Sequence, residues 1–140
     1  MAINRRTLRL PEVETGSLIP PIIHQTYPTL TLPEALRRNV EELQALNGGW
    51  EHRLYDDQAI ERFIRDHYGP GMLRLFQAID PSYGAARADL FRYLVVYRLG
   101  GVYLDIKSRF LTPIDQAIDR ADRFVVAQWS NGPGERYEQF

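Results

Sequence analysis

The sequence predicts an α/β fold with a mostly parallel sheet flanked by helices. Short apolar runs of strand length alternate with longer stretches whose apolar residues recur at helical spacing. Glycine and proline clusters separate these stretches, at residues 47–49, 69–71, 81–84 and 100–101. Strands that alternate with helices favour a parallel sheet, because each helix carries the chain back to the start of the next strand.

A strand and a helix are predicted first. The apolar run at residues 19–27 is typical of a buried strand. A helix is predicted to begin near Pro33, because proline suits the first helical turn and Thr31 can cap it. The sequence Asn47-Gly48-Gly49 ends this helix.

A second strand and two further helical stretches are predicted in the middle of the chain. The strand covers residues 50–55, and Asp56 or Asp57 can cap the helix that follows. Gly69-Pro70-Gly71 breaks the chain again. A separate short amphipathic stretch is predicted after that break, at residues 72–79.

The next predicted helix carries two charged residues at helical spacing. Asp89 and Arg92 are three residues apart, which places them on one face of a helix. This spacing fits either a ligand site or an ordinary intrahelical ion pair, and we favour the ligand site because of the motif that follows.

The glycine pair Gly100-Gly101 leads from this helix into a predicted third strand. Side chains alternate along a strand, so Tyr103, Asp105 and Lys107 are expected to share one face, opposite the apolar residues 102, 104 and 106. A last strand is predicted at residues 124–129.

The composition is that of one globular domain. The 140 residues suffice for a single core, expected over residues 19–140, whereas residues 1–18 lack periodicity and predict a loose extension. A net charge of −1 gives no basic footprint for nucleic acid, so no nucleic-acid partner is expected. The absence of cysteine and of any run as long as a membrane span predicts a cytoplasmic protein, associated with a membrane only through a lipid acceptor.

Two segments carry a family resemblance. Residues 85–93, AARADLFRY, followed by GGVYLD at residues 100–105, resemble the glycosyltransferases of family 32 with a DXD sugar-binding region. Residues 19–27, IPPIIHQTY, resemble the first strand of that family, which includes initiating mannosyltransferases of yeast and is related to glucosylating clostridial toxins. Two motifs in the right order are far more specific than a lone DXD. The resemblance implies a GT-A-like, Rossmann-like fold.

The resemblance also implies roles for individual residues. Asp89 and Arg92 are expected to act as catalytic residues that contact the sugar hydroxyls and the donor diphosphate. Asp105, the first aspartate of the motif, is the third expected catalytic residue, near the donor ribose and a metal ion. His24, Gln25 and Tyr103 are further donor-binding candidates. His24 and Gln25 lie where ligands bind open α/β sheets, at the carboxyl end of a strand, but a structural pair of hydrogen-bonded side chains fits that position equally well. Tyr103 can contact the donor or pack against the sheet.

Lys107 stands where the family carries the last aspartate of DXD. An ammonium group has no lone pair, so Lys107 cannot ligate Mn²⁺ or Mg²⁺. Three outcomes follow: Lys107 pairs directly with the diphosphate, Asp105 alone holds a metal with donor phosphates and waters, or Lys107 is simply solvated. His52 has no spacing that suggests a metal site and is expected at the surface.

The predicted function is hexosyl transfer from a nucleotide sugar, a UDP- or GDP-hexose, to a glycan or glycolipid acceptor. The resemblance implies retention of the anomeric configuration and mannose, glucose or galactose as the sugar. Related domains continue past the last predicted strand, so the acceptor-binding half is expected to be missing. The alternative is a non-catalytic nucleotide-sugar-binding remnant, or a partial domain that needs a partner chain.

Overall fold

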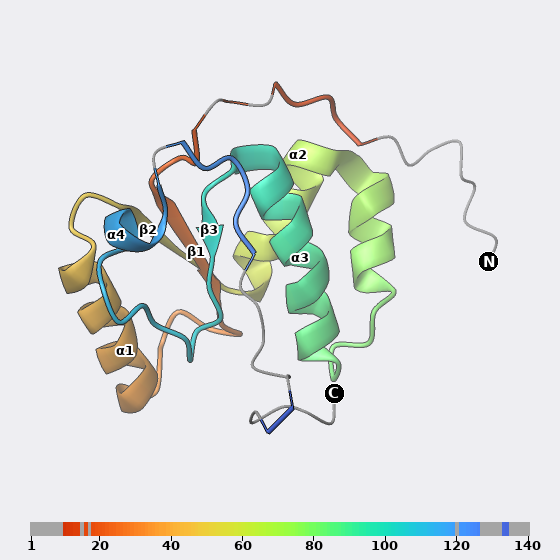
Figure 1. Ribbon diagram of the computed structural model, residues 1–140. Helices are drawn as coiled ribbons and strands as arrows, with labels where there is room; N and C mark the ends of the chain where they lie inside the picture. The colour runs from red at the N-terminus through yellow and green to blue at the C-terminus, as the bar shows by residue number, and fades with distance from the viewer. Residues whose placement is uncertain (1–9, 15, 17, 120, 127–132, 135–140) are drawn as a thin grey trace.

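One parallel sheet lies at the centre of the structure, a computed structural model that describes residues 10–14, 16, 18–119, 121–126 and 133–134 (Figure 1). Its strands run in the order β2-β1-β3. Their bounds are Ile22–Thr26 for β1, Glu51–Tyr55 for β2 and Val102–Tyr103 for β3. Since the strands are parallel, their carboxyl ends meet at one edge of the sheet.

Helices cover both faces of this sheet within the described part of the chain. Helices α1 (Glu34–Leu46) and α4 (Ile114–Ala117) lie on one side in Figure 1, and α2 (Asp57–Gln77) and α3 (Gly84–Leu99) lie on the other. The predicted fold class, a parallel sheet flanked by helices, is confirmed.

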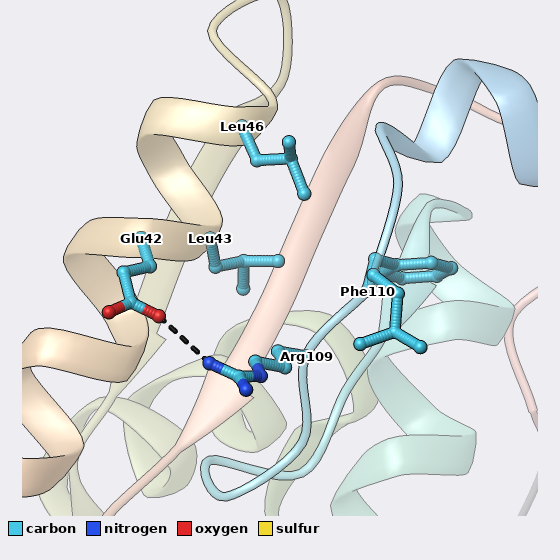
Figure 2. A pocket seen from close by; sticks show the side chains of 6 residues that line it. Glu42, Leu43, Leu46, Arg109 and Phe110 are labelled. Carbon is cyan, nitrogen blue, oxygen red and sulfur yellow. Dashed lines mark hydrogen bonds and ion pairs between the residues drawn. The ribbon is translucent and has the colours of Figure 1, made fainter.

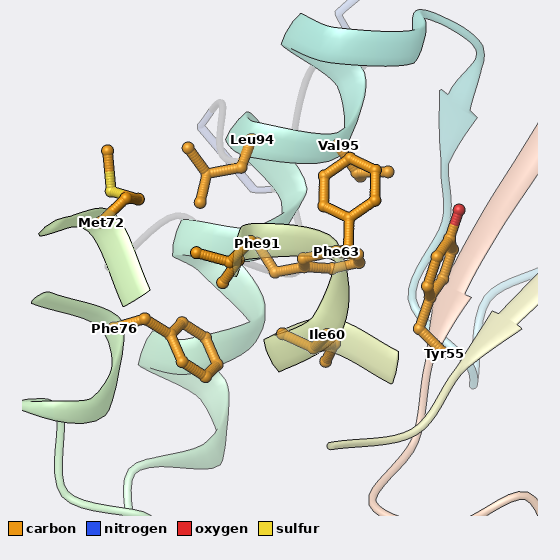
Figure 3. Close-up of a cluster of buried hydrophobic side chains, with 9 residues drawn as sticks. Tyr55, Ile60, Phe63, Met72, Phe76, Phe91, Leu94 and Val95 are labelled. Carbon is orange, nitrogen blue, oxygen red and sulfur yellow. The ribbon is translucent and has the colours of Figure 1, made fainter. Parts of the chain in front are cut away.

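The larger core cluster lies between β2, α2 and α3 (Figure 3). Phe91 is completely buried, and its ring centroid lies 5.0 Å from that of Tyr55 and 5.5 Å from that of Phe63. Each fully buried aromatic ring contributes about 2 to 3 kcal/mol of burial free energy. The other buried members are Ile60, Ile64, Met72, Phe76, Leu94 and Val95.

A smaller cluster fills the opposite face of the sheet. Ile23, Leu43 and Ile114 pack together there. The buried side chain of Asn47 joins α1 to α4, because it donates to the Leu43 carbonyl at 2.8 Å and accepts from the Ile114 amide at 2.7 Å. The predicted helix stop at Asn47 is therefore also a tertiary contact.

The helix boundaries differ from the predictions at the start of α1. Pro33 occupies the N-cap of α1 without a side-chain cap bond, so the expected cap at Thr31 is wrong. Asp56 does cap α2, since its carboxylate accepts from the Ala59 amide at 2.7 Å. The break predicted at Gly69-Pro70-Gly71 is confirmed, since the Gly69 backbone is not helical (φ 78°, ψ −179°) and divides α2 into two helical stretches.

The third strand is shorter than predicted. It ends at Tyr103, and the last sheet contact is the Leu104 amide donating to the His24 carbonyl at 3.0 Å. Residues 105–108 form a turn, with the Ser108 amide donating to the Asp105 carbonyl at 2.8 Å. The expected strand alternation through Lys107 is therefore wrong.

The chain ends are only partly described. Residues 124–126 are not in a strand, and the rest of the strand predicted at 124–129 lies outside the described residues. Most of the predicted extension, residues 1–18, also lies outside them. Among the described helices, none combines the length and apolarity needed to cross a membrane.

Candidate functional site

Side chains from β1, β3 and α3 meet at the carboxyl edge of the sheet. The Thr26 hydroxyl and the Tyr103 phenol form a hydrogen bond of 2.9 Å. The Arg92 guanidinium lies over the Tyr103 ring, 5.2 Å from its centroid. Helix α3 runs opposite to the strands, so its first half reaches this edge (Figure 1). The structure thus brings the predicted residues Arg92 and Tyr103 together.

Asp89 and Arg92 form the ion pair that their spacing allows. Both side chains are about half exposed, so the pair contributes only a few tenths of a kcal/mol, roughly, to stability. The pair uses one of the five N–H donors of the guanidinium. The Nε atom of Arg92 is buried without an acceptor among the described residues. A ligand can therefore reach only the N–H donors on the terminal nitrogens of Arg92, one of which already pairs with Asp89.

Asp105 and Arg92 both act electrostatically on Tyr103. Burial is the main cause that raises the pKa of the Tyr103 phenol, and the nearby Asp105 carboxylate raises it further. The Thr26 hydrogen bond and the Arg92 charge act in the opposite direction. The phenol is therefore neutral near pH 7, and its ring lies beside the Arg92 guanidinium.

The turn at residues 105–108 is fixed by side chains from distant parts of the chain. Gln25 Nε2 donates to the Asp105 carbonyl at 3.3 Å. Asn39 Nδ2, from α1, donates to the carbonyls of Ile106 and Ser108, both at 3.0 Å. The side chains of Asp105 and Lys107 are exposed on this turn. Backbone anchoring thus leaves both charged groups facing solvent.

His24 is buried and fully hydrogen-bonded. Its Nε2 lies 3.0 Å from the Gly100 carbonyl and its Nδ1 lies 3.1 Å from the Tyr55 hydroxyl. A carbonyl only accepts, so Nε2 carries the proton and Nδ1 accepts from Tyr55. Neither ring nitrogen is free for a ligand. His24 instead holds the glycine turn that leads into β3.

His24 predicts a pH-dependent stability. Burial lowers the pKa of His24 to about 4, below its ordinary value of 6.5, so the unfolded chain binds the proton more tightly. The free energy of unfolding is expected to fall by about 2 kcal/mol between pH 7 and pH 5. Burial also lowers the pKa of His52, which adds to the loss.

Urea titrations at the two pH values test this expectation. In a His24→Gln variant, the drop between pH 7 and pH 5 should shrink to less than half of the wild-type drop. An equal drop in both proteins would place the titrating group elsewhere.

Gln25 is also completely buried, and it connects β2 to the turn. Its Oε1 accepts from His52 Nε2 at 2.8 Å, while its amide nitrogen donates to the Asp105 carbonyl. His52 is half-buried, so its expected place at the surface is wrong. Gln25 positions the backbone of Asp105 through a side chain that does not itself face solvent.

The side chains at this edge do not form a metal cage. Within the residues that the structure describes, no three His, Cys, Asp or Glu side chains are grouped to hold a metal ion. Asp105 offers one carboxylate, and the ammonium of Lys107 has no lone pair to offer. The donor set therefore does not fit a divalent cation held by protein ligands.

A pocket of about 340 Å³ lies away from these residues (Figure 2). It lies between α1 and residues 109–111, and the Glu42–Arg109 ion pair of 3.0 Å joins its two sides. Leu43, Leu46 and Phe110 form its apolar wall. None of the predicted site residues lines it, so the carboxyl edge remains the candidate site.

The sequence of the chain matches a known protein family. A family model described as a glycosyltransferase sugar-binding region containing a DXD motif matches residues 33–124, well over half of the chain. The chain belongs to this glycosyltransferase family. The matched region contains Asp89, Arg92, Tyr103, Asp105 and Lys107, so the carboxyl edge is largely built from family sequence.

Several relatives of this glycosyltransferase family are curated. The chain is 35% identical over 97 residues to an inositol phosphoceramide mannosyltransferase 2 of Schizosaccharomyces pombe, covering 69% of this chain and 27% of the relative. It is 36% identical over 89 residues to a mannosyl phosphorylinositol ceramide synthase of Saccharomyces cerevisiae, covering 64% and 22%.

A third relative carries a different name. The chain is 30% identical over 88 residues to an initiation-specific alpha-1,6-mannosyltransferase of Candida albicans, covering 61% of this chain and 22% of the relative. The chain thus spans about a quarter of the length of the curated glycosyltransferases it matches. No solved structure matches the chain significantly.

Three residues of the candidate site were not predicted. Thr26 binds the Tyr103 phenol, Tyr55 binds His24, and Asn39 holds the turn. The position of Thr26 at the carboxyl end of β1 is a signal that could have identified it. Asn39 lies on an amphipathic helix and carries no such signal.

Proposed function

We propose that this domain binds a nucleotide-sugar donor at the carboxyl edge of its sheet and serves the transfer of a hexose. The observation that carries the proposal is the contact between the Arg92 guanidinium and the Tyr103 ring at that edge, with the exposed Asp105 two residues beyond Tyr103. Family membership supports glycosyl transfer, and the names of the relatives favour mannose among the hexoses.

The chemistry of the reaction explains the choice of residues. When the bond between the sugar and the diphosphate breaks, negative charge develops on the leaving diphosphate. The planar guanidinium of Arg92 can donate to two phosphate oxygens at once. The Asp105 carboxylate can accept hydrogen bonds from hydroxyl groups of the nucleotide sugar, and the Tyr103 phenol can donate a hydrogen bond to the nucleotide sugar. In this proposal Asp89 keeps Arg92 oriented and accepts from sugar hydroxyls.

The acceptor in this proposal is a glycan or a glycolipid. One relative is named an inositol phosphoceramide mannosyltransferase, another a mannosyl phosphorylinositol ceramide synthase, and a third an initiation-specific alpha-1,6-mannosyltransferase. We favour the glycolipid class because the two relatives of highest identity among these three are both named for a ceramide lipid. Retention of the anomeric configuration stays a prediction, which the configuration of the first product, followed by NMR, would test.

A thermal-shift screen tests the proposed donor. GDP-mannose, UDP-glucose and UDP-galactose are added to the 140-residue chain, each with EDTA and with Mn²⁺. A ligand at 100 times its dissociation constant stabilises the fold by about 2.7 kcal/mol, which raises the melting temperature by several degrees. We expect the largest shift with GDP-mannose. No shift with any of the three would refute donor binding by this chain.

Asp105→Asn is expected to weaken donor binding about 3- to 10-fold, because it removes one charge-assisted hydrogen bond. Calorimetric titration of wild type and variant with GDP-mannose measures the ratio. Asp66→Asn, an exposed change on α2 with the same loss of charge, serves as the control and should leave the affinity unchanged. Equal affinities for Asp105→Asn and wild type would place the donor elsewhere.

A further inference from the structure

Lys107 is the only lysine of the chain, and the structure gives it an unusual position. It lies in the turn at residues 105–108, two residues beyond Asp105, and its side chain is exposed. Gln25 and Asn39 fix the backbone of this turn by hydrogen bonds on both sides of Lys107. The charge of Lys107 is thus carried by an anchored turn that follows the carboxyl end of β3.

Lys107 has no carboxylate partner in the described residues. All five ion pairs found there use arginine, in the pairs Arg37–Glu41, Arg38–Glu34, Arg53–Glu51, Arg92–Asp89 and Arg109–Glu42. An exposed ammonium on a fixed turn, with no partner of its own, is suited to bind an anionic ligand as a point charge.

The lysine at position 107 also argues against a divalent cation held between Asp105 and the donor diphosphate. The family is described by a DXD motif, whereas this chain has Asp105-Ile106-Lys107. The second carboxylate is replaced by a group that cannot coordinate a metal. The ammonium, carried by the same turn, would also repel a divalent ion bound at Asp105, because like charges disfavour each other.

We propose that the Lys107 ammonium binds the diphosphate of the donor directly, so that this domain holds its nucleotide sugar without a divalent metal ion. Lys107 and Arg92 then supply the two positive charges of the site, one from the turn after β3 and one from α3. The inference rests on the proposed function, since it names how the same site holds the diphosphate.

Calorimetric titrations with GDP-mannose, GDP and GMP test this inference. Each ligand is titrated in two buffers, one with about 1 mM EDTA to remove metal ions and one with about 1 mM Mn²⁺ to supply them. For wild type we expect GDP-mannose affinities within about twofold of each other in the two buffers. Lys107→Ala should weaken GDP-mannose and GDP by a similar factor of about tenfold or more, as expected for one hydrogen bond to a charged group. GMP, which lacks the second phosphate, should be much less affected.

Two further variants control the result. Arg65→Ala removes an equal charge from the exposed face of α2 and should leave all three affinities unchanged. Lys107→Asp restores the second aspartate of the motif, so its GDP-mannose binding should be lost in EDTA and recovered in Mn²⁺. Since Lys107 is exposed, each variant should keep the wild-type circular dichroism spectrum and melting temperature.

Two results would overturn the inference while leaving the proposed function intact. The first is wild-type binding of GDP-mannose that disappears in EDTA. The second is a Lys107→Ala variant that binds GDP and GDP-mannose as tightly as wild type. Failure of wild type to bind any nucleotide sugar in either buffer would instead refute the proposed function, and the inference with it.

Discussion

Arg92→Ala is expected to weaken GDP-mannose binding by about 2 to 3 kcal/mol, or roughly 30- to 150-fold. The guanidinium is the group at the carboxyl edge that can span two phosphate oxygens, and most of its donors are not used within the protein. The stability of the fold should change little, because the lost ion pair with Asp89 is largely solvent-exposed. Calorimetric titration and urea unfolding measure the two effects separately.

Two companion variants separate charge from geometry. Arg92→Lys keeps the charge but loses the planar fork and its stacking on Tyr103, so an intermediate loss of affinity is expected. Asp89→Asn leaves Arg92 in place and tests whether the ion pair itself matters for binding.

A comparison of Arg92→Ala with the surface control Arg65→Ala can contradict the proposed role of Arg92. If Arg92→Ala loses no more affinity than the surface control Arg65→Ala, the guanidinium does not touch the donor. The Asp89–Arg92 pair would then be the ordinary intrahelical ion pair that the spacing also allowed.

The fold class could be predicted because it depends on local periodicity. Helix α3 and the glycine pair after it follow from apolar spacing and from the conformations that glycine allows, and both are where the sequence predicts them. The cap at Asp56 is likewise a local property, fulfilled by a contact three residues away.

The end of β3 could not be predicted because distant residues determine it. The hydrogen bonds that turn the chain at Asp105 come from Gln25 and Asn39, which are 80 and 67 residues away from their acceptors. A strand pattern of alternating side chains continues through Lys107 in the sequence, and only these tertiary contacts interrupt it. The positions of Asp105 and Lys107 therefore depend on the packing of α1 and β1.

The environment of His24 shows the same limit. Its place in a strand was predicted, and so was its closeness to the edge where ligands bind. The register sets His24 beside Tyr103 rather than beyond the strand end, and its ring turns toward Tyr55 and Gly100. Register across a sheet is a non-local property, so the sequence alone could not separate a ligand-binding histidine from a buried structural one.

Gly101→Ala is expected to lower the free energy of unfolding by about 3 kcal/mol. Gly101 has φ +85°, a conformation that costs an alanine about 1 to 2 kcal/mol. An added Cβ would also lie 2.6 Å from the Ile22 carbonyl oxygen and 3.0 Å from His24 Nε2. Because these neighbours belong to β1, relief of the overlap requires β3 to move away from the sheet.

Gly48→Ala is the matched control for this prediction. Gly48 lies in the turn before β2, and a Cβ there would meet nothing within 4 Å. Urea unfolding should therefore leave it near wild-type stability, or up to about 1 kcal/mol above it, since alanine restricts the unfolded chain. Equal stabilities for the two variants would mean that β3 can shift without cost.

If β3 could shift without cost, the proposed donor site would also be in doubt, because its residues depend on the position of β3. Tyr103, Asp105 and Lys107 are placed within six residues of Gly101, and Arg92 contacts the ring of Tyr103. The affinity of Gly101→Ala for GDP-mannose, measured at a temperature where the variant remains folded, should therefore fall. A shift of β3 would move Tyr103 away from Thr26 and Arg92, and it would move Asp105 and Lys107 as well. The single substitution Gly101→Ala is therefore expected to lower both the stability of the fold and the affinity for the nucleotide sugar.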